Sequence, residues 1–126
     1  MSSAILLIAH GSRRATANQD LVLLSEMVRE RIPEEDVPII EIAYLELAEP
    51  SIPQGLQACV DRGATSIRML PYFLSAGAHV SRDLREFCDH FLEAHPQIVC
   101  TVCPPLGLHP SIVDVLLTRM EQQFED

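Results

Sequence analysis

The sequence has 126 residues, of which 48% are hydrophobic and 21% are charged, and its formal net charge is −9. A chain of this length and hydrophobicity buries one core, so we expect a single folded domain over residues 1–126. The acidic balance argues against a nucleic-acid partner, and the apolar runs are too short to cross a membrane. The chain opens without a signal-peptide pattern, which predicts a cytoplasmic location.

Apolar runs alternate with helical patterns along the whole chain. Runs typical of buried strands occupy 3–9, 39–45, 65–73 and 98–103. We expect helices over 15–32, from a Ser51 cap to Gly63, between the loop 74–80 and Pro96, and after His109. A polar turn is expected over 33–36. This order predicts an α/β fold, a single lobe with a four-stranded parallel sheet flanked by helices on both faces.

The last expected helix has a clear amphipathic pattern. Ser111 and Asp114 resemble a capping box at its start. Its apolar residues then fall on one side at helical spacing, and they are Val113, Leu116, Leu117, Met120 and Phe124.

The first strand ends in a histidine that is followed by basic residues. His10 and Gly11 come directly after the aliphatic run, and Arg13 and Arg14 come before the first helix. The residue past the carboxyl end of a parallel strand lies at the edge where ligands bind. Glycine allows the sharp exit from the strand.

The third strand is followed by a similar segment. Its loop contains His79, with Arg82 and Arg85 shortly after it. Arginines at both exits run against the acidic charge of the chain, and a guanidinium pairs with a carboxylate or phosphate through two hydrogen bonds. The alternative is that these arginines form an ordinary solvated face.

Four residues capable of binding metal or protons fall in or beside the loops that follow the strands, namely His10, Glu46, His79 and His109. All such loops of a parallel sheet emerge at one edge, so these residues are expected near one another. Two imidazoles and a carboxylate suit a divalent transition metal, and imidazole also accepts protons near neutral pH. His109 also fits a purely structural role, because His-Pro suits a helix start.

The four cysteines predict neither a disulfide nor a metal site. Cys100 and Cys103 form a C-x-x-C pattern, but they lie on an expected strand, where residues three apart point to opposite faces. Ordinary buried thiols are the better interpretation.

Four segments together resemble the sirohydrochlorin chelatases of the small CbiX-like kind, a class II chelatase family. They are AHGSR after the first strand, YLELAEPSI after the second, PYFLSAGAHVSRDL at the third and PPLGLHP before the last helix. The resemblance implies insertion of a divalent metal, Co²⁺ before Ni²⁺ or Fe²⁺, into sirohydrochlorin without ATP. The metal is a substrate, and the family's two motif histidines, which bind it and assist catalysis, fall on His10 and His79.

The resemblance also implies roles for other residues and a mode of assembly. The family's loop carboxylate, a third metal ligand, falls on Glu46, whereas Ser12, Arg13, Arg14, Gly77 and Arg82 are expected to contact the tetrapyrrole. The substrate carries many carboxylates, which gives the arginines a purpose. The larger relatives contain two such lobes in one chain, so a chain with one lobe implies a homodimer whose loop edges face each other.

Two other functions fit part of the sequence. His-Gly after the first strand also occurs in histidine phosphatases, but that chemistry needs an arginine directly before the histidine, and Ala9 stands there. A non-catalytic protein that binds metal or tetrapyrrole with the same loops needs the same ligands, and only turnover separates it from a chelatase.

Overall fold

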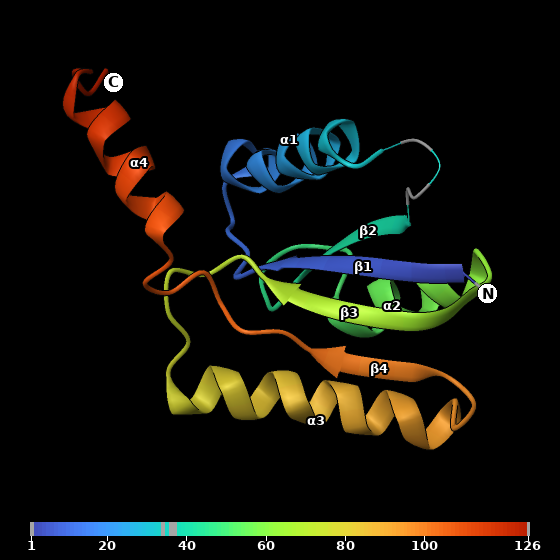
Figure 1. The fold of residues 1–126 in the computed structure, drawn as a ribbon. Coiled ribbons are helices and arrows are strands. Elements are labelled where there is room, and N and C mark those ends of the chain that lie inside the picture. Colours follow the sequence, from blue (N-terminus) through green and yellow to red (C-terminus); the bar gives the residue numbers. More distant parts are fainter. Residues whose placement is uncertain (1, 34, 36–37, 126) are drawn as a thin grey trace.

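A computed structural model describes residues 2–33, 35 and 38–125, so part of the turn expected over 33–36 lies outside the described residues. The elements are β1 (Ser2–Ala9), α1 (Ala15–Arg31), β2 (Ile39–Tyr44), α2 (Ile52–Asp61), β3 (Ala64–Pro71), α3 (Ala78–Ala94), β4 (Val99–Val102) and α4 (Pro110–Met120) (Figure 1). The strands form one parallel sheet in the order β2-β1-β3-β4. The predicted α/β fold is confirmed.

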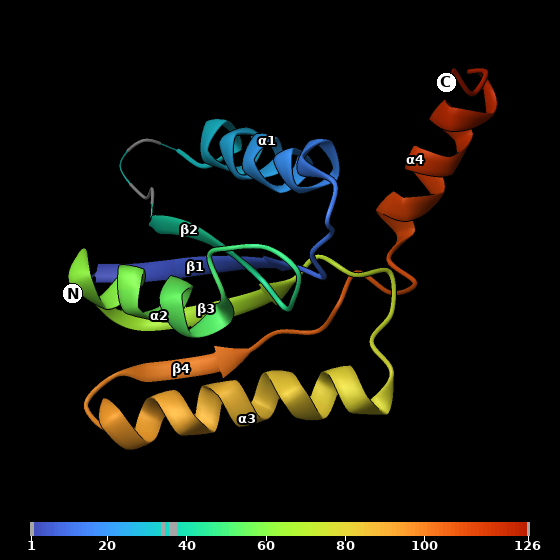
Figure 2. The same ribbon diagram turned by 180° about the vertical axis from the view of Figure 1, so that it is seen from behind.

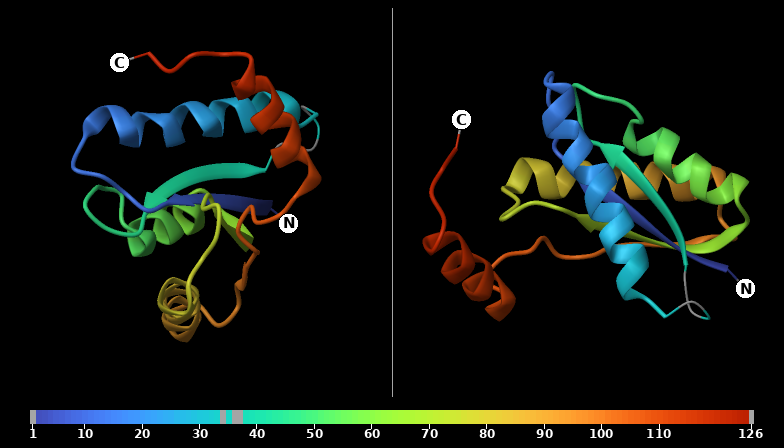
Figure 3. Two further views of the ribbon diagram at one scale, coloured as in Figure 1. Left: turned by 90° about the vertical axis from the view of Figure 1, so that its left-hand side faces the viewer. Right: turned by 90° about the horizontal axis from the view of Figure 1, so that it is seen from above.

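Successive residues of β1 point to opposite faces of the sheet and define two cores. Leu6 and Ile8 pack on the side of α2 and α3, whereas Leu7 packs with Leu21 of α1 on the other side. The left view of Figure 3 shows α1 on one side of the sheet and α2 and α3 on the other. Because β1 is an inner strand and is covered on both faces, its carboxyl end is firmly positioned.

Helix α4 differs from the other three helices because it buries none of its residues. It leaves the carboxyl edge of the sheet and extends away from the body (Figures 1 and 2). Leu116 and Met120 are 63% and 70% exposed. The helix ends at Met120, so the predicted stripe lacks Phe124, and its remaining apolar residues are exposed instead of packed on the sheet.

The structure confirms some of the expected helix ends and corrects others. The Ser51 side chain accepts from the Gln54 N–H at 3.3 Å, and Gln54 Oε1 accepts from the Ser51 N–H at 2.7 Å, as in a capping box. The capping box expected at Ser111 is wrong. His109 caps α4, with its Nδ1 accepting from the Ser111 N–H at 3.1 Å.

The described residues contain neither a disulfide nor a helix suited to crossing a membrane. All four cysteines are free; Cys59, Cys88 and Cys100 are buried as predicted, whereas Cys103 is only partly buried. Burial raises the pKa of the Cys59 thiol to about 12. Within the described part of the chain, no helix has the length and apolar character needed to cross a membrane.

Candidate functional site

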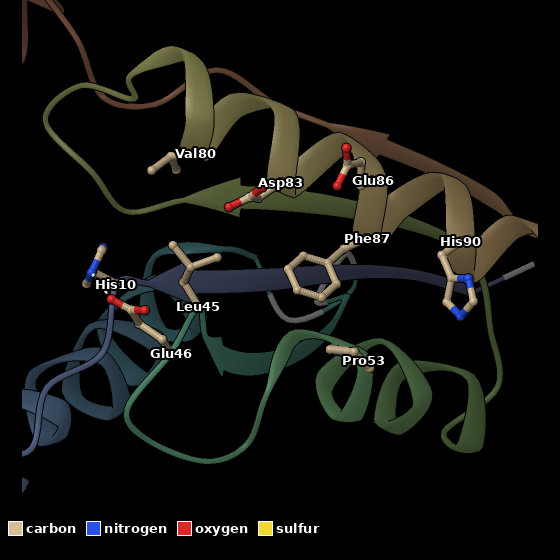
Figure 4. Close-up of a pocket in the computed structure, with 9 residues that line it drawn as sticks. All are labelled: His10, Leu45, Glu46, Pro53, Val80, Asp83, Glu86, Phe87 and His90. Atoms are coloured by element: carbon tan, nitrogen blue, oxygen red, sulfur yellow. Dashed lines mark hydrogen bonds and ion pairs between the residues drawn. The ribbon is translucent and has the colours of Figure 1, made fainter.

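The chain continues to pair beyond the ends of β1 and β2, and this pairing brings His10 and Glu46 together. The Leu45 N–H donates to the Ala9 carbonyl at 2.9 Å, and the Glu46 N–H donates to the His10 carbonyl at 3.0 Å. Their side chains are also joined, with His10 Nε2 2.8 Å from Glu46 Oε1 (Figure 4). The expectation that these two residues meet at one edge is confirmed.

Gly11 is required for this approach of the two chain segments. Its φ is +100°, and a Cβ at this position would lie 1.7 Å from the Glu46 carbonyl oxygen. Any other residue would have to move the segment that contains Glu46. Glycine is therefore required for steric reasons in the segment AHGSR.

The contact between His10 and Glu46 fixes which imidazole nitrogen is available. An ionised carboxylate only accepts hydrogen bonds, so the His10 Nε2–H donates to Glu46 and the Nδ1 lone pair is left for a metal or a proton. Both side chains are 56% exposed, so they are accessible to a ligand. The Phe73 ring stands edge-on to the imidazole, with 6.3 Å between ring centroids.

A pocket of about 550 Å³ extends from this pair along the groove between α2 and α3. Figure 4 shows His10 and Glu46 at one end and His90 at the other. The lining residues are His10, Leu45, Glu46, Pro53, Val80, Asp83, Glu86, Phe87 and His90. The α3 residues among them were missed from the sequence, where the helical spacing of positions 80, 83, 87 and 90 was the available signal.

His79 does not join His10 and Glu46. It was expected in a loop, but α3 begins at Ala78, so His79 lies in the first helical turn and Gly77 is the N-cap. Its Nδ1 is 2.6 Å from Arg82 Nη2. Among the described residues, no three His, Cys, Asp or Glu side chains are grouped closely enough to hold a metal ion. The chain thus brings two of the three expected metal ligands together.

The segment after β1 is held by a network around Ser12. Asn18 accepts from the Ser12 N–H at 2.9 Å and donates to the Ser12 carbonyl at 2.7 Å. Ser12 Oγ in turn accepts from the Arg14 N–H at 3.0 Å. The Tyr44 hydroxyl donates to the Asn18 carbonyl at 2.6 Å, and burial raises its pKa. These bonds fix the backbone from which Arg13 and Arg14 project.

The electrostatics of this edge favour anions beside the helix starts. No Asp or Glu lies in the first turn of α1, α2, α3 or α4, so the positive ends of the helix dipoles are not neutralised there. Arg13, Arg14 and Arg82 form no ion pair with an acidic side chain within the described residues. A Cβ at Gly77 would meet no heavy atom within 4 Å, so space is open beside it.

These features define an α/β protein with an imidazole–carboxylate pair at the carboxyl edge of its sheet. The family model described as CbiX matches residues 4–123. The chain therefore belongs to the CbiX family, and the resemblance drawn from the four sequence segments is confirmed.

Individual relatives agree with this assignment. The chain is 36% identical to a sirohydrochlorin ferrochelatase of Priestia megaterium over 98% of this chain and 45% of the relative. It matches the structure of the sirohydrochlorin chelatase SirB from Bacillus subtilis subspecies spizizenii in complex with cobalt, with 34% identity and a TM-score of 0.86, over 96% of this chain and 50% of that one. The chain spans about half the length of the curated relatives it matches.

A further solved structure has a length close to that of this chain. A CbiX protein from Marinobacter aquaeolei VT8 matches with 29% identity and a TM-score of 0.76, over 96% of this chain and 99% of that chain. The matched fold therefore spans almost the whole of that solved chain.

Proposed function

We propose that this protein inserts a divalent metal ion into sirohydrochlorin without ATP. The observation that carries the proposal is the contact of 2.8 Å between His10 and Glu46 at one end of the pocket. Relatives named as sirohydrochlorin chelatases, and the membership of the CbiX family, support the choice of substrate.

The proposed chemistry has two requirements that the pair can meet. The metal must lose part of its water shell, and the free-base macrocycle must release two pyrrole protons. His10 holds the partly hydrated ion through Nδ1, while Glu46 keeps the ring in the correct tautomer and orientation. After the metal has moved to the macrocycle, His10 and Glu46 can accept the released protons.

We assign the substrate side of the site to the residues around the starts of α1 and α3. Arg13, Arg14 and Arg82 pair with carboxylates of the tetrapyrrole. Ser12 holds the backbone beneath Arg14, and the open space at Gly77 admits the macrocycle edge. His79 is assigned to the same ion as His10, and Glu46 can become the third ligand only after its hydrogen bond to His10 Nε2 is released.

The identity of the metal is part of the proposal. We expect Co²⁺ to be inserted, with Fe²⁺ and Ni²⁺ as the next candidates. One relative is named for iron and another was solved with cobalt, so the names support both. Imidazole and carboxylate ligands accept all three ions. Competition between equimolar metals under anaerobic conditions, followed by absorbance of the products, identifies the preferred ion.

A second copy of the chain is proposed to complete the cleft. One copy offers an open edge, whereas a flat macrocycle needs walls on both sides to exclude water. The exposed apolar residues of α4 supply surface for such a contact, including Leu116 and Met120. Sedimentation of wild type and of a Leu116→Glu, Met120→Glu variant tests this, with Met27→Glu on α1 as a control. A wild-type monomer that turns over with substrate bound would refute the shared cleft.

The enzymatic proposal is tested by anaerobic incubation with sirohydrochlorin and Co²⁺, followed by absorbance. His10→Ala and Glu46→Gln are each expected to lower the rate about 10- to 100-fold. His95→Ala is the control, because this residue stacks on Phe91 at the far end of α3. Normal rates in both site variants would contradict the assignment of His10 and Glu46 to the active site. Tight binding of metal and tetrapyrrole without insertion would instead identify a carrier.

A further inference from the structure

Among the described residues, the backbone of Ser12 pairs with no strand of the sheet. The pairing beyond β1 and β2 reaches the His10 carbonyl, which accepts from the Glu46 N–H at 3.0 Å. Gly11, with a φ of +100°, then turns the chain out of the sheet. The N–H and C=O groups of Ser12 therefore need partners elsewhere. The Asn18 side chain supplies both, at 2.9 Å and 2.7 Å.

This double contact depends on the amide group of Asn18. A carboxamide carries a donor and an acceptor side by side, so it can bind the N–H and the C=O of one residue together. A carboxylate of the same shape would still accept from the N–H but would repel the C=O. Asn18 is itself held in place, because the hydroxyl of the buried Tyr44 donates to its carbonyl at 2.6 Å. A chain of hydrogen bonds thus runs from the core at Tyr44 through Asn18 to Ser12.

The segment held in this way carries two cations in an unfavourable place. Arg13 and Arg14 stand directly before α1, at the positive end of its dipole. Arg14 occupies the N-cap position without a side-chain cap, where Ser, Thr, Asp or Asn would stabilise the helix more. Helix stability therefore does not account for arginine at this position. A carboxylate bound by the two arginines would supply the negative charge that the helix start lacks.

We propose that Asn18 is a positioning residue for the tetrapyrrole, because its amide holds Ser12 so that Arg13 and Arg14 are presented to the substrate carboxylates before binding. Groups that are already ordered lose less conformational entropy on binding, so Asn18 raises the affinity without touching the substrate. The metal side does not need this contact, since His10 is fixed by its own pairing with Glu46. Asn18 thus serves one of the two substrates. This inference rests on the proposed function, which supplies the tetrapyrrole.

Steady-state kinetics with sirohydrochlorin and Co²⁺ varied separately tests this role. Asn18→Ala is expected to raise the KM for sirohydrochlorin about 3- to 10-fold, the scale of one lost hydrogen bond, while kcat and the KM for Co²⁺ stay close to wild type. Asn18→Asp should also raise the KM for sirohydrochlorin, because it loses the donor to the Ser12 carbonyl and adds a negative charge near the arginines. Gln19→Ala is the matched control, since this neighbouring amide is exposed and forms none of the hydrogen bonds around Ser12.

Tyr44→Phe keeps the buried ring and removes only the hydroxyl that binds the Asn18 carbonyl. It should raise the KM for sirohydrochlorin in the same direction, so it keeps the test decisive even if Asn18→Ala does not fold. Without any ligand, the Ser12 amide should exchange with deuterium faster in Asn18→Ala than in wild type, because its acceptor is gone.

Two results would overturn the role of Asn18. One is a loss of thermal stability in Asn18→Ala or Tyr44→Phe with an unchanged KM for sirohydrochlorin, which would make the contact purely structural. The other is an equal rise in KM for both substrates. A wild type that binds no sirohydrochlorin would overturn the proposed function and the role of Asn18 with it. Normal turnover in wild type and in both variants would overturn the role of Asn18 alone.

Discussion

The turn after β1 and helix α4 lie at the same edge of the sheet but are packed in opposite ways. At the turn, Gly11 has no room for a single additional carbon beside the Glu46 carbonyl. In α4, no residue is buried. The turn comes directly after the apolar run of β1, and α4 itself contains an apolar stripe. The comparison teaches that such a pattern predicts that a segment needs a partner, whereas the place of that partner depends on the path of the chain.

The largest expected effect concerns the tightly packed turn after β1. Gly11→Ala should lower the free energy of unfolding by at least ~3 kcal/mol, because positive φ and a backbone clash act together. Gly63→Ala is the matched control, since its φ is +95° and nothing lies within 4 Å of its built Cβ. It should cost about 1–2 kcal/mol for the φ alone. Urea unfolding of both variants measures the two losses in unfolding free energy, and their difference is the cost of the clash at Gly11. Equal losses would show that Gly11 has room for a Cβ.

The next prediction compares leucines on α3 and α4. Leu84→Ala should cost about 2–5 kcal/mol, because Leu84 is 1% exposed and leaves a cavity. Leu116→Ala should change the unfolding free energy of the monomer by less than about 0.5 kcal/mol. The measurement is urea unfolding at low protein concentration. A loss at Leu116 that appears only at high concentration would show that another copy covers α4.

The smallest expected effect concerns alkaline pH. Burial raises the pKa of Cys59 to about 12 and raises that of Cys100, where contact with Cys88 adds to it. The unfolded chain loses these protons from about pH 9, while the folded protein keeps them, so stability should fall as the pH rises above 9. Thermal unfolding in steps from pH 8 to 11 measures this. The unfolding midpoint of Cys59→Ala should fall less steeply with pH than that of wild type. An equally steep fall in both proteins would contradict the assignment.

Much of the fold was predictable because its signals are local. Continuous aliphatic runs marked the buried strands, and the alternation of strands and helices required a parallel sheet. The same rule placed His10 and Glu46 at one edge, and they are in contact. The Ser51 cap was also predicted from its residue type, and in the structure Gln54 completes a capping box with it.

The remaining features depend on contacts that no local pattern contains. The direction of α4 depends on the loop before it and on what covers the helix outside one chain. His79 was expected in a loop over 74–80, but α3 begins within that range, at Ala78. Among the described residues, His79 forms no three-residue cluster with His10 and Glu46. The pocket depends on how α3 is placed relative to α2, which the sequence does not specify. Asp83 and His90 could therefore be recognised as lining residues only from the structure.

The exposure of α4 has a consequence for local opening of the molecule. A helix of 11 residues that buries none of its residues is only marginally stable in water. In an isolated copy, its amides should exchange with deuterium far faster than those of β1, which open only when the whole sheet does. We therefore expect β1 and α4 to open as separate units with very different lifetimes. Exchange rates along α4 report directly on how long any partner remains bound.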